Sequence, residues 1–357
     1  MNRVMRKFVS PMLMLGAIFM SIGGASAQER VVVSSWGGTF QDILREVVFV
    51  PFEKETGIKV IEATGPTYAK INSMVRSGNI EWDVATLVAS DFVTAAKKNL
   101  LEKIDYSQMK PGALDGVEVG KEEYGLAYVA FSKVVAYSTK AFPGDAHPRT
   151  WQDVWDTAKF PGPRTLDAGN YSVPPIEYAL LADGVSPKEL YPLDLKRAYK
   201  ALDRIRPRVA KWATTAAMQP QAIVDGEAVI GAVTAGRAAE LNQNGAPINF
   251  SWEGGLINYD YLSIPKGAPN YQNAIKLIEF VLRPDVQAKM VSVQTLGPNN
   301  KRAFEHMSAE RAKLLPTFPE NLAKQIMYQP AWWAEVDASG KSNLELNQEM
   351  WQSWILK

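Results

Sequence analysis

Ser34-Ser35-Trp36-Gly37-Gly38-Thr39-Phe40 is the stretch from which the fold can be worked out. The β-branched run Val31–Val33 precedes it and the amphipathic segment Gln41–Val48 follows it, which predicts a strand, a tight glycine turn and a helix. A turn of this kind lies at the carboxyl end of a strand, where open α/β sheets bind ligands. Its glycines leave backbone N–H groups accessible, and Trp36 offers a flat apolar wall. An ordinary connection with Trp36 in the core fits the same pattern.

The alternation of strand and helix continues along the chain, which predicts a parallel sheet built from βαβ units. A longer strand over 124–139 carries the chain into a second α/β unit at 140–250, and a strand over 257–264 brings it back. Two lobes joined by two strands form a hinge, and the cleft between them can close on a small molecule. The predicted division is a signal peptide at 1–27, lobe 1 at 28–133 and 255–303, and lobe 2 at 134–254 and 304–357, with the C-terminal helices.

The first 27 residues have the features of a signal peptide. Arg3, Arg6 and Lys7 form a basic region, the apolar run Met12–Ile22 follows, and Ala25-Ser26-Ala27 fits the small-x-small cleavage rule. An N-terminal membrane anchor is the alternative, although the apolar run is short for a span. Because the chain has no cysteine, it can carry neither a disulfide nor a lipid-modified cysteine. We therefore expect a soluble periplasmic protein cleaved after Ala27.

Charge and composition exclude several functions. The 39 basic and 38 acidic residues nearly balance and form no basic run, so nucleic acid and anionic membranes are poor partners. His147 and His306 are far apart without metal-ligand spacing, and no cysteine nucleophile exists. We expect no catalytic residues, metal or cofactor. The weaker alternatives are an enzyme, a metal carrier using Tyr259 and Tyr261, and an anion receptor at Gly37-Gly38.

Six segments carry a resemblance to a known family, and they occur in a consistent order along the chain. They are Ser35–Gly38, Pro51–Val60, Trp82–Val84, Thr150–Trp155, Gly226–Gly231 and Leu282–Gln287. Together they resemble the extracellular solute-binding proteins of bacterial ABC importers, in the polyamine-binding (spermidine/putrescine) branch. The resemblance implies an α/β type II periplasmic binding fold with two lobes on a two-strand hinge. It also implies a monomer that delivers its ligand to the membrane permease subunits.

The resemblance also implies where the ligand binds, with several departures from the polyamine pattern. The aromatic residue after the first strand is kept as Trp36, and two acids are kept as Asp167 and Asp260. A second acid of lobe 2 is replaced by Asn170. Positions at which the family has an aromatic or a hydroxyl residue are occupied here by Thr39, Ala89, Asp91, Thr234 and Asn258. The predicted ligand-binding residues are Trp36, Gly37, Thr39, Asp91, Asp167, Asn170, Thr234, Asn258 and Asp260, followed by Ser90, Tyr171, Arg237 and Tyr259 as a secondary set.

A polyamine needs carboxylates spaced to meet its ammonium groups, since ammonium–carboxylate hydrogen bonds are strong. Asp167 and Asp260 are expected on opposite sides of the cleft, so one ligand could bridge both. Each has a structural alternative: Asp167 as a turn cap, and Asp260 in an ion pair with a lysine or arginine. Asp91 is also a candidate helix cap. Strand alternation places Asn258 and Asp260 on one face, and Tyr259 and Tyr261 on the other.

The expected ligand is a polyamine such as putrescine or spermidine, and Arg237 carries the one alternative ligand class. It begins a predicted helix and is most simply a solvated residue there. If it faces the cleft instead, its guanidinium could bind a carboxylate in a bidentate manner. The ligand would then be zwitterionic, such as an ω-amino acid or an opine, and not a polyamine.

Overall fold

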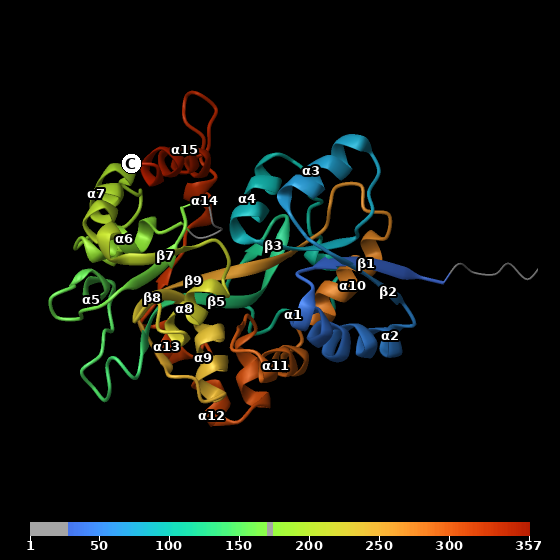
Figure 1. The fold of residues 1–357 in the computed structure, drawn as a ribbon. Coiled ribbons are helices and arrows are strands. Elements are labelled where there is room, and N and C mark those ends of the chain that lie inside the picture. Colours follow the sequence, from blue (N-terminus) through green and yellow to red (C-terminus); the bar gives the residue numbers. More distant parts are fainter. Residues whose placement is uncertain (1–27, 170–173) are drawn as a thin grey trace, which may run out of the picture.

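The computed structural model describes residues 28–169 and 174–357. The predicted signal peptide and the predicted site residues Asn170 and Tyr171 lie outside the described residues. The described chain forms two α/β lobes built on one mixed sheet, with helices on both faces (Figure 1). None of the helices in the described part is long and apolar enough to cross a membrane.

The sheet runs through both lobes in the strand order β2-β1-β3-β9-β5-β8-β6-β7. In lobe 1, β1 pairs in parallel with β2 and β3, and in lobe 2, β6 pairs in parallel with β7 and β8. The lobes therefore repeat one topology on either side of the antiparallel pair β5 and β9. The strand bounds are β1 Arg30–Ser35, β2 Lys59–Thr64, β3 Val84–Val88, β5 Gly125–Ser138, β6 Arg164–Asp167, β7 Val209–Ala213, β8 Ile230–Thr234 and β9 Ile248–Ser263, with short β4 Lys121–Glu122, β10 Gly297–Pro298 and β11 Ile326–Met327 at the margins.

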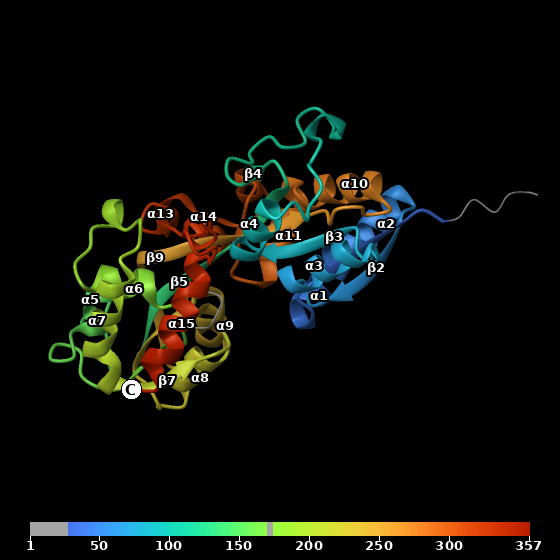
Figure 2. The same ribbon diagram turned by 90° about the horizontal axis from the view of Figure 1, so that it is seen from above.

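The long strands β5 and β9 form the hinge, and seen from above the lobes lie on either side of them (Figure 2). Their register shifts between the pairs Lys133↔Leu256 and Val135↔Ser251, so that Val134 alone lies opposite residues 252–255. This bulge contains Gly254, whose φ of +70° favours glycine. The interruption of the strand lies where the chain passes from one lobe to the other.

Helices cover both faces of the lobe 1 sheet. One face carries the continuous helical segment formed by α1 (Gly38–Leu44), the π-helical turn Arg45–Phe49 and α2 (Val50–Thr56), together with α10 (Tyr271–Val281) and α11 (Pro284–Val293). The other face carries α3 (Tyr68–Ser77) and α4 (Ala89–Lys97). Each face has its own buried apolar cluster, so the sheet is covered on both sides.

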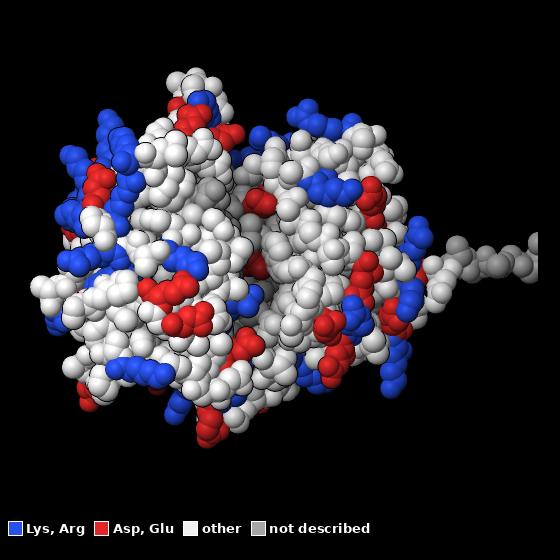
Figure 3. All heavy atoms as spheres, in the orientation of Figure 1, with Lys and Arg blue, Asp and Glu red and all other residues white. Residues whose placement is uncertain are grey.

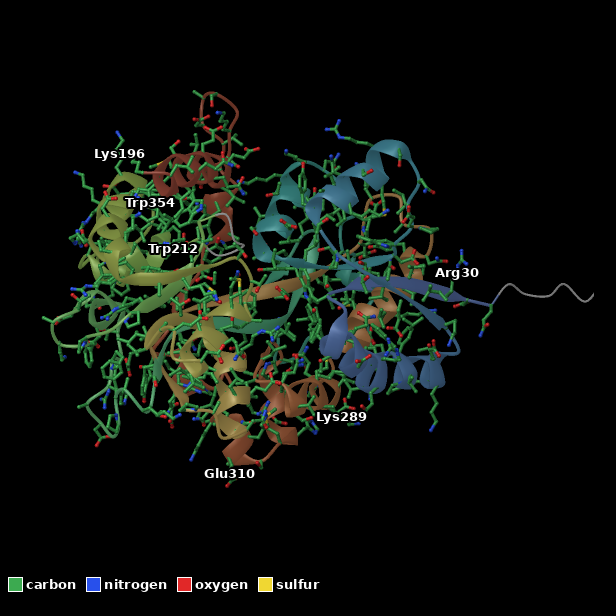
Figure 4. All side chains as sticks on the ribbon, in the orientation of Figure 1. Arg30, Lys196, Trp212, Lys289, Glu310 and Trp354 are labelled. Carbon is green, nitrogen blue, oxygen red and sulfur yellow. The ribbon has the colours of Figure 1, made fainter. Side chains whose placement is uncertain are left out.

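Lobe 2 is also covered on both faces. One apolar cluster joins the sheet to α5 (Trp151–Trp155), α6 (Ile176–Ala182), α7 (Leu195–Ile205), α14 (Pro330–Trp333) and α15 (Asn343–Ile355), and another joins it to α8 (Met218–Val224) and α9 (Ala235–Gln243). Trp354 holds α15 on the lobe, since its ring lies 5.4 Å from that of Trp212 (Figure 4). The two lobes also touch directly, because Lys97 Nζ of α4 donates to the carbonyl of Ala334 beyond α14 at 3.0 Å.

Most predicted elements are present, with shifted ends. β9 begins nine residues before the predicted strand, because the Gly254-Gly255 bulge interrupts its alternating pattern. β7 and α8 were not predicted. α4 begins at Ala89 and not at 92, so Asp91 lies within its first turn. The prediction placed all of 304–357 with lobe 2. In the structure α12 (Ala309–Ala312) contacts lobe 1, because Arg311 Nε donates to the carbonyl of Val291 in α11 at 3.0 Å.

Candidate functional site

A hollow separates the two lobes, and both acidic and basic side chains are visible in it (Figure 3). The carboxyl ends of the parallel strands β1 and β3 from one lobe, and of β6 and β8 from the other, lie on either side of the hinge strands. In open α/β sheets ligands bind at such ends. Polar groups at these four strand ends and on the hinge strands between them are therefore candidates for the site.

Asp260 and Trp36 form the centre of the lobe 1 side. Asp260 lies in β9 between Val88 of β3 and Val129 of β5, and the indole Nε1 of Trp36 donates to its Oδ2 at 3.0 Å. Asp260 is only 8% exposed, whereas Trp36 is 38% exposed. The other oxygen, Oδ1, is buried and has no hydrogen-bond partner among the described residues. Burial raises the pKa of Asp260 to about 7, and the Trp36 hydrogen bond opposes that rise.

The absence of a neighbouring cation is the informative feature of Asp260. The predicted alternative, an ion pair with a lysine or arginine, is not formed by any described residue. Tyr128 lies near the carboxylate, since burial and the Asp260 charge raise its pKa well above the usual value. A β-bulge between Ala127 and Val129 lies opposite Asp260 in the strand pairing. A buried carboxylate with one free oxygen is costly in the unliganded protein and is suited to receive a cation.

Asp167 differs from Asp260 in that its carboxylate is already satisfied. It is fully buried at the end of β6, and its Oδ1 accepts from Lys133 Nζ at 2.9 Å and from Gln219 Nε2. Its Oδ2 accepts from the hydroxyl of Tyr178 at 3.0 Å. Burial raises the pKa of Asp167, and the Lys133 ammonium opposes that rise. This side chain is held inside lobe 2 by an ion pair and two further donors.

Asp91 and Ser90 have local roles in the described structure. Asp91 Oδ2 accepts from the backbone N–H of Tyr68 at 2.9 Å, which caps the start of α3 and not α4. Its partial burial raises its pKa. Ser90 is buried in the first turn of α4, where its carbonyl accepts from the Thr94 hydroxyl. Neither side chain forms a hydrogen bond with Asp260 in the described part of the chain.

Trp36 is followed by a turn that adopts the glycine-rich geometry expected of it. Gly37 and Gly38 both have positive φ, of 75° and 57°, which few other residues adopt without strain. Thr39 is exposed in the first turn of α1. The turn therefore places Trp36 at the edge of the sheet beside Asp260.

The remaining predicted residues are spread over the hinge and lobe 2. Asn258 shares the Asp260 face of β9 and is 7% exposed, whereas Tyr259 is buried among residues of α3 and α4. Burial raises the pKa of Tyr259 to about 12. Thr234 ends β8 opposite Lys133. Arg237 is exposed in the first turn of α9 and forms no hydrogen bond or ion pair within the described part of the chain.

The sequence analysis missed the partners of Asp167. Lys133 lies in the otherwise apolar run of β5, with buried valines directly after it. A lysine inside a buried strand is rarely tolerated unless a carboxylate pairs with it, so this was the available signal. Tyr178 and Gln219 carry no such signal, because a tyrosine and a glutamine on helices have no fixed partner.

These features define a class of protein. Two α/β lobes of the same topology, hinged by two strands and with polar groups at facing strand ends, form a receptor that encloses a small solute. The chain belongs to the bacterial extracellular solute-binding protein family, whose sequence model matches residues 48–317. It is the solute-binding component of an ABC transporter, as the resemblance implied.

Three relatives show the range of ligands among similar proteins. The γ-aminobutyric acid-binding protein of Pseudomonas aeruginosa is 30% identical over 91% of this chain and 92% of its own. The spermidine/putrescine-binding periplasmic protein of Escherichia coli K12 is 28% identical over 97% and 99%. The structure of the PBP AgtB from A. tumefaciens R10 in complex with agropinic acid aligns with a TM-score of 0.76 and 34% identity, over 92% and 99%. The names of all three describe binding proteins.

Proposed function

We propose that this protein is a periplasmic receptor for a zwitterionic amino compound, with an ω-amino acid such as γ-aminobutyrate as the simplest example. One observation carries the proposal: the two carboxylates predicted to bind ammonium groups differ in state. Among the described residues, Asp260 has an oxygen without a hydrogen-bond partner and forms no ion pair, while Asp167 is neutralised by Lys133. The cleft thus offers one ammonium site, where a diamine needs two.

The ammonium end of the ligand binds at Asp260 beneath Trp36. An ammonium donates to the free Oδ1 in a charge-assisted hydrogen bond, the stronger kind of hydrogen bond. The exposed indole face of Trp36 adds a cation–π attraction of roughly 0.5–2 kcal/mol. Asp260 belongs to a hinge strand, so a ligand held there lies between both lobes and favours their closure.

The carboxylate end points to the start of α9. Arg237 lies there with a guanidinium that no other described residue binds, and a helix N-terminus favours negative charge. The two lobes are in contact beside this helix start, because a Cβ on Gly236 would lie 2.9 Å from the Thr295 carbonyl of the opposite lobe. An arginine fork binds a planar carboxylate with two parallel hydrogen bonds.

A polyamine is the second candidate, and the E. coli relative supports it through its coverage of nearly the whole chain. For a polyamine to bind in the two-carboxylate mode, Asp167 would have to exchange Lys133 for the ligand. The 30% identity to the γ-aminobutyric acid-binding protein and the acid bound by AgtB favour the zwitterion.

The cellular setting follows from the family and from the sequence. We propose export by the signal peptide 1–27, cleavage after Ala27, and a monomer that docks both lobes on the permease subunits. The proposed lobe boundaries are 133/134 in β5 and 254/255 in β9, which the register shift supports. In the C-terminal segment, α12 is assigned to lobe 1 through its contact with α11, and α14 and α15 to lobe 2.

Isothermal titration of ligand-stripped protein (residues 28–357) tests the ligand class. We expect γ-aminobutyrate to bind at least tenfold more tightly than putrescine or spermidine. The matched probe is n-butylamine, which lacks the carboxylate. The variant Arg237→Met should lower the affinity for γ-aminobutyrate without changing the affinity for n-butylamine. Tighter binding of putrescine than of γ-aminobutyrate would overturn the proposal in favour of the polyamine.

A further inference from the structure

Lys133 occupies a position from which it can control ligand choice. In the antiparallel pairing, Lys133 lies opposite Leu256, Phe131 opposite Asn258, and Val129 opposite Asp260. Residues paired in this way share a face of the sheet, so Lys133 and Asp260 lie in one row along the hinge. Asp260 and Leu256 are four residue steps apart along β9, which corresponds to about 13 Å. The row therefore runs from the ammonium site of lobe 1 to the ion pair of lobe 2.

We propose that Lys133 is a specificity-determining residue: its ion pair with Asp167 removes the second carboxylate that a diamine needs, and so restricts the cleft to solutes with one ammonium group. The inference rests on the proposed function and adds the residue that sets the substrate class. The lysine acts through Asp167, so its contribution is electrostatic and requires no contact with the ligand.

Burial and further hydrogen bonds stabilise the ion pair between Lys133 and Asp167. Lys133 is 2% exposed and Asp167 is not exposed, so solvent screens neither charge. Gln219 and Tyr178 donate to the two carboxylate oxygens from α8 and α6, which fixes the carboxylate toward the interior. A ligand ammonium could take Asp167 only by displacing Lys133 from this ion pair, and breaking a buried ion pair is strongly unfavourable.

Arg237 adds to the discrimination at this end of the row. Lys133 lies opposite Thr234, the residue that joins β8 to α9, and Arg237 is exposed in the first turn of α9. The guanidinium of Arg237 would repel the far ammonium of putrescine and attract the carboxylate of γ-aminobutyrate. Among the described residues paired along this row, Asp260 is the charged residue at the other end.

The test is the Lys133→Met variant, titrated with putrescine and γ-aminobutyrate at pH 7.5. Methionine keeps the length of the side chain without the charge, so the negative charge of Asp167 is no longer neutralised by Lys133 and attracts a second ammonium. We expect putrescine affinity to rise at least tenfold relative to γ-aminobutyrate. An unchanged ratio of the two dissociation constants would overturn the inference.

The matched control replaces both charges, in the double variant Lys133→Met, Asp167→Asn. Since it offers no carboxylate in lobe 2, we expect no gain for putrescine and an affinity for γ-aminobutyrate within threefold of the wild type. If the single variant does not fold, the double variant still tests the inference. A tenfold lower affinity for γ-aminobutyrate, or a tenfold higher affinity for putrescine, would contradict the inference. The proposed function is judged separately, from the wild-type protein and n-butylamine.

Discussion

Trp36 and Asp260 come from opposite parts of the chain and meet at one hydrogen bond, with the indole Nε1 3.0 Å from Oδ2. The bond leaves Oδ1 of the buried carboxylate without a partner among the described residues. A half-satisfied buried charge reduces stability and is suited to bind a ligand, because a cation that binds there supplies the missing partner. The contact therefore links the stability of the unliganded protein to its binding function.

Replacing Asp260 by asparagine should weaken γ-aminobutyrate binding. The variant keeps the shape and removes the charge, and a hydrogen bond to a charged group contributes about 1.5–3 kcal/mol, or roughly 10- to 150-fold in the dissociation constant. Isothermal titration at pH 7.5 measures the change. Asp42→Asn is the control, since Asp42 lies on the surface of α1 in an ion pair with Arg45. Equal affinity of the Asp260 variant and the wild type would remove Asp260 from the site.

Ligand binding should release protons near neutral pH. The pKa of Asp260 is raised to about 7 in the unliganded protein, and an ammonium requires the carboxylate form. Binding at pH 7 should therefore release roughly half a proton, and affinity should fall about tenfold per pH unit well below pH 7. Titrations in two buffers with different ionisation enthalpies measure the released protons. Identical heats in both buffers would contradict this assignment, and Asp260→Asn should show no buffer dependence.

The same carboxyl group gives a pH dependence of stability with a defined sign. Its folded-state pKa of about 7 exceeds the ordinary value of 3.8, so the native state binds an extra proton between these values. The free energy of unfolding should fall as the pH rises through this window, by up to about 4 kcal/mol, and then stay level. Denaturant titrations of unliganded wild type and Asp260→Asn at pH 5 and 8 test this. At pH 8 the Asp260→Asn variant should be more stable than the wild type, whereas at pH 5 it should not.

Trp36→Phe separates the two roles of the indole. Phenylalanine keeps an aromatic wall but cannot donate to Asp260, so the pKa of Asp260 should rise further. At pH 7.5 the affinity for γ-aminobutyrate should fall several-fold, and the deficit should shrink at pH 9, where the carboxyl group is ionised again. A deficit of the same size at both pH values would mean that Trp36 acts only as an apolar wall.

Much of the fold could be predicted because its signals are local. The alternation of apolar residues and glycine turns located β1, β3, β5 and β6, and Thr150, a residue type favoured at helix N-caps, located the start of α5. The start of β9 could not be found, because its pairing with β5 across the lobe boundary is a tertiary effect. The Gly254-Gly255 bulge also breaks the period of two in the sequence.

The placement of the predicted site residues on strands and turns could be predicted better than their partners. The family resemblance gave Asp167 and Asp260 as two acids of the site, and the sequence predicted the strands on which the structure has them. It could not show that Lys133 pairs with Asp167, since the two lie 34 residues apart in the chain and meet only through the neighbouring strand β8. Nor could it show that Asp91 would cap α3, a helix that begins 23 residues earlier.

Glu177 should limit stability at high pH without taking part in binding. It is fully buried on α6, where Oε1 accepts from Trp333 Nε1 at 2.7 Å and from the Tyr191 hydroxyl at 2.8 Å. Burial raises its pKa to about 7 from the ordinary value of 4.5, so the native state binds an extra proton in between. Above pH 7 the buried group is charged, and this lowers the free energy of unfolding.

Glu177→Gln should therefore stabilise the protein at pH 8, by up to about 3 kcal/mol, and change it little at pH 5. Glutamine keeps the oxygen to which Trp333 and Tyr191 donate. Denaturant titrations at both pH values measure the effect, with the exposed Glu320→Gln as control. A variant that is no more stable than the wild type at pH 8 would show that Glu177 stays protonated there.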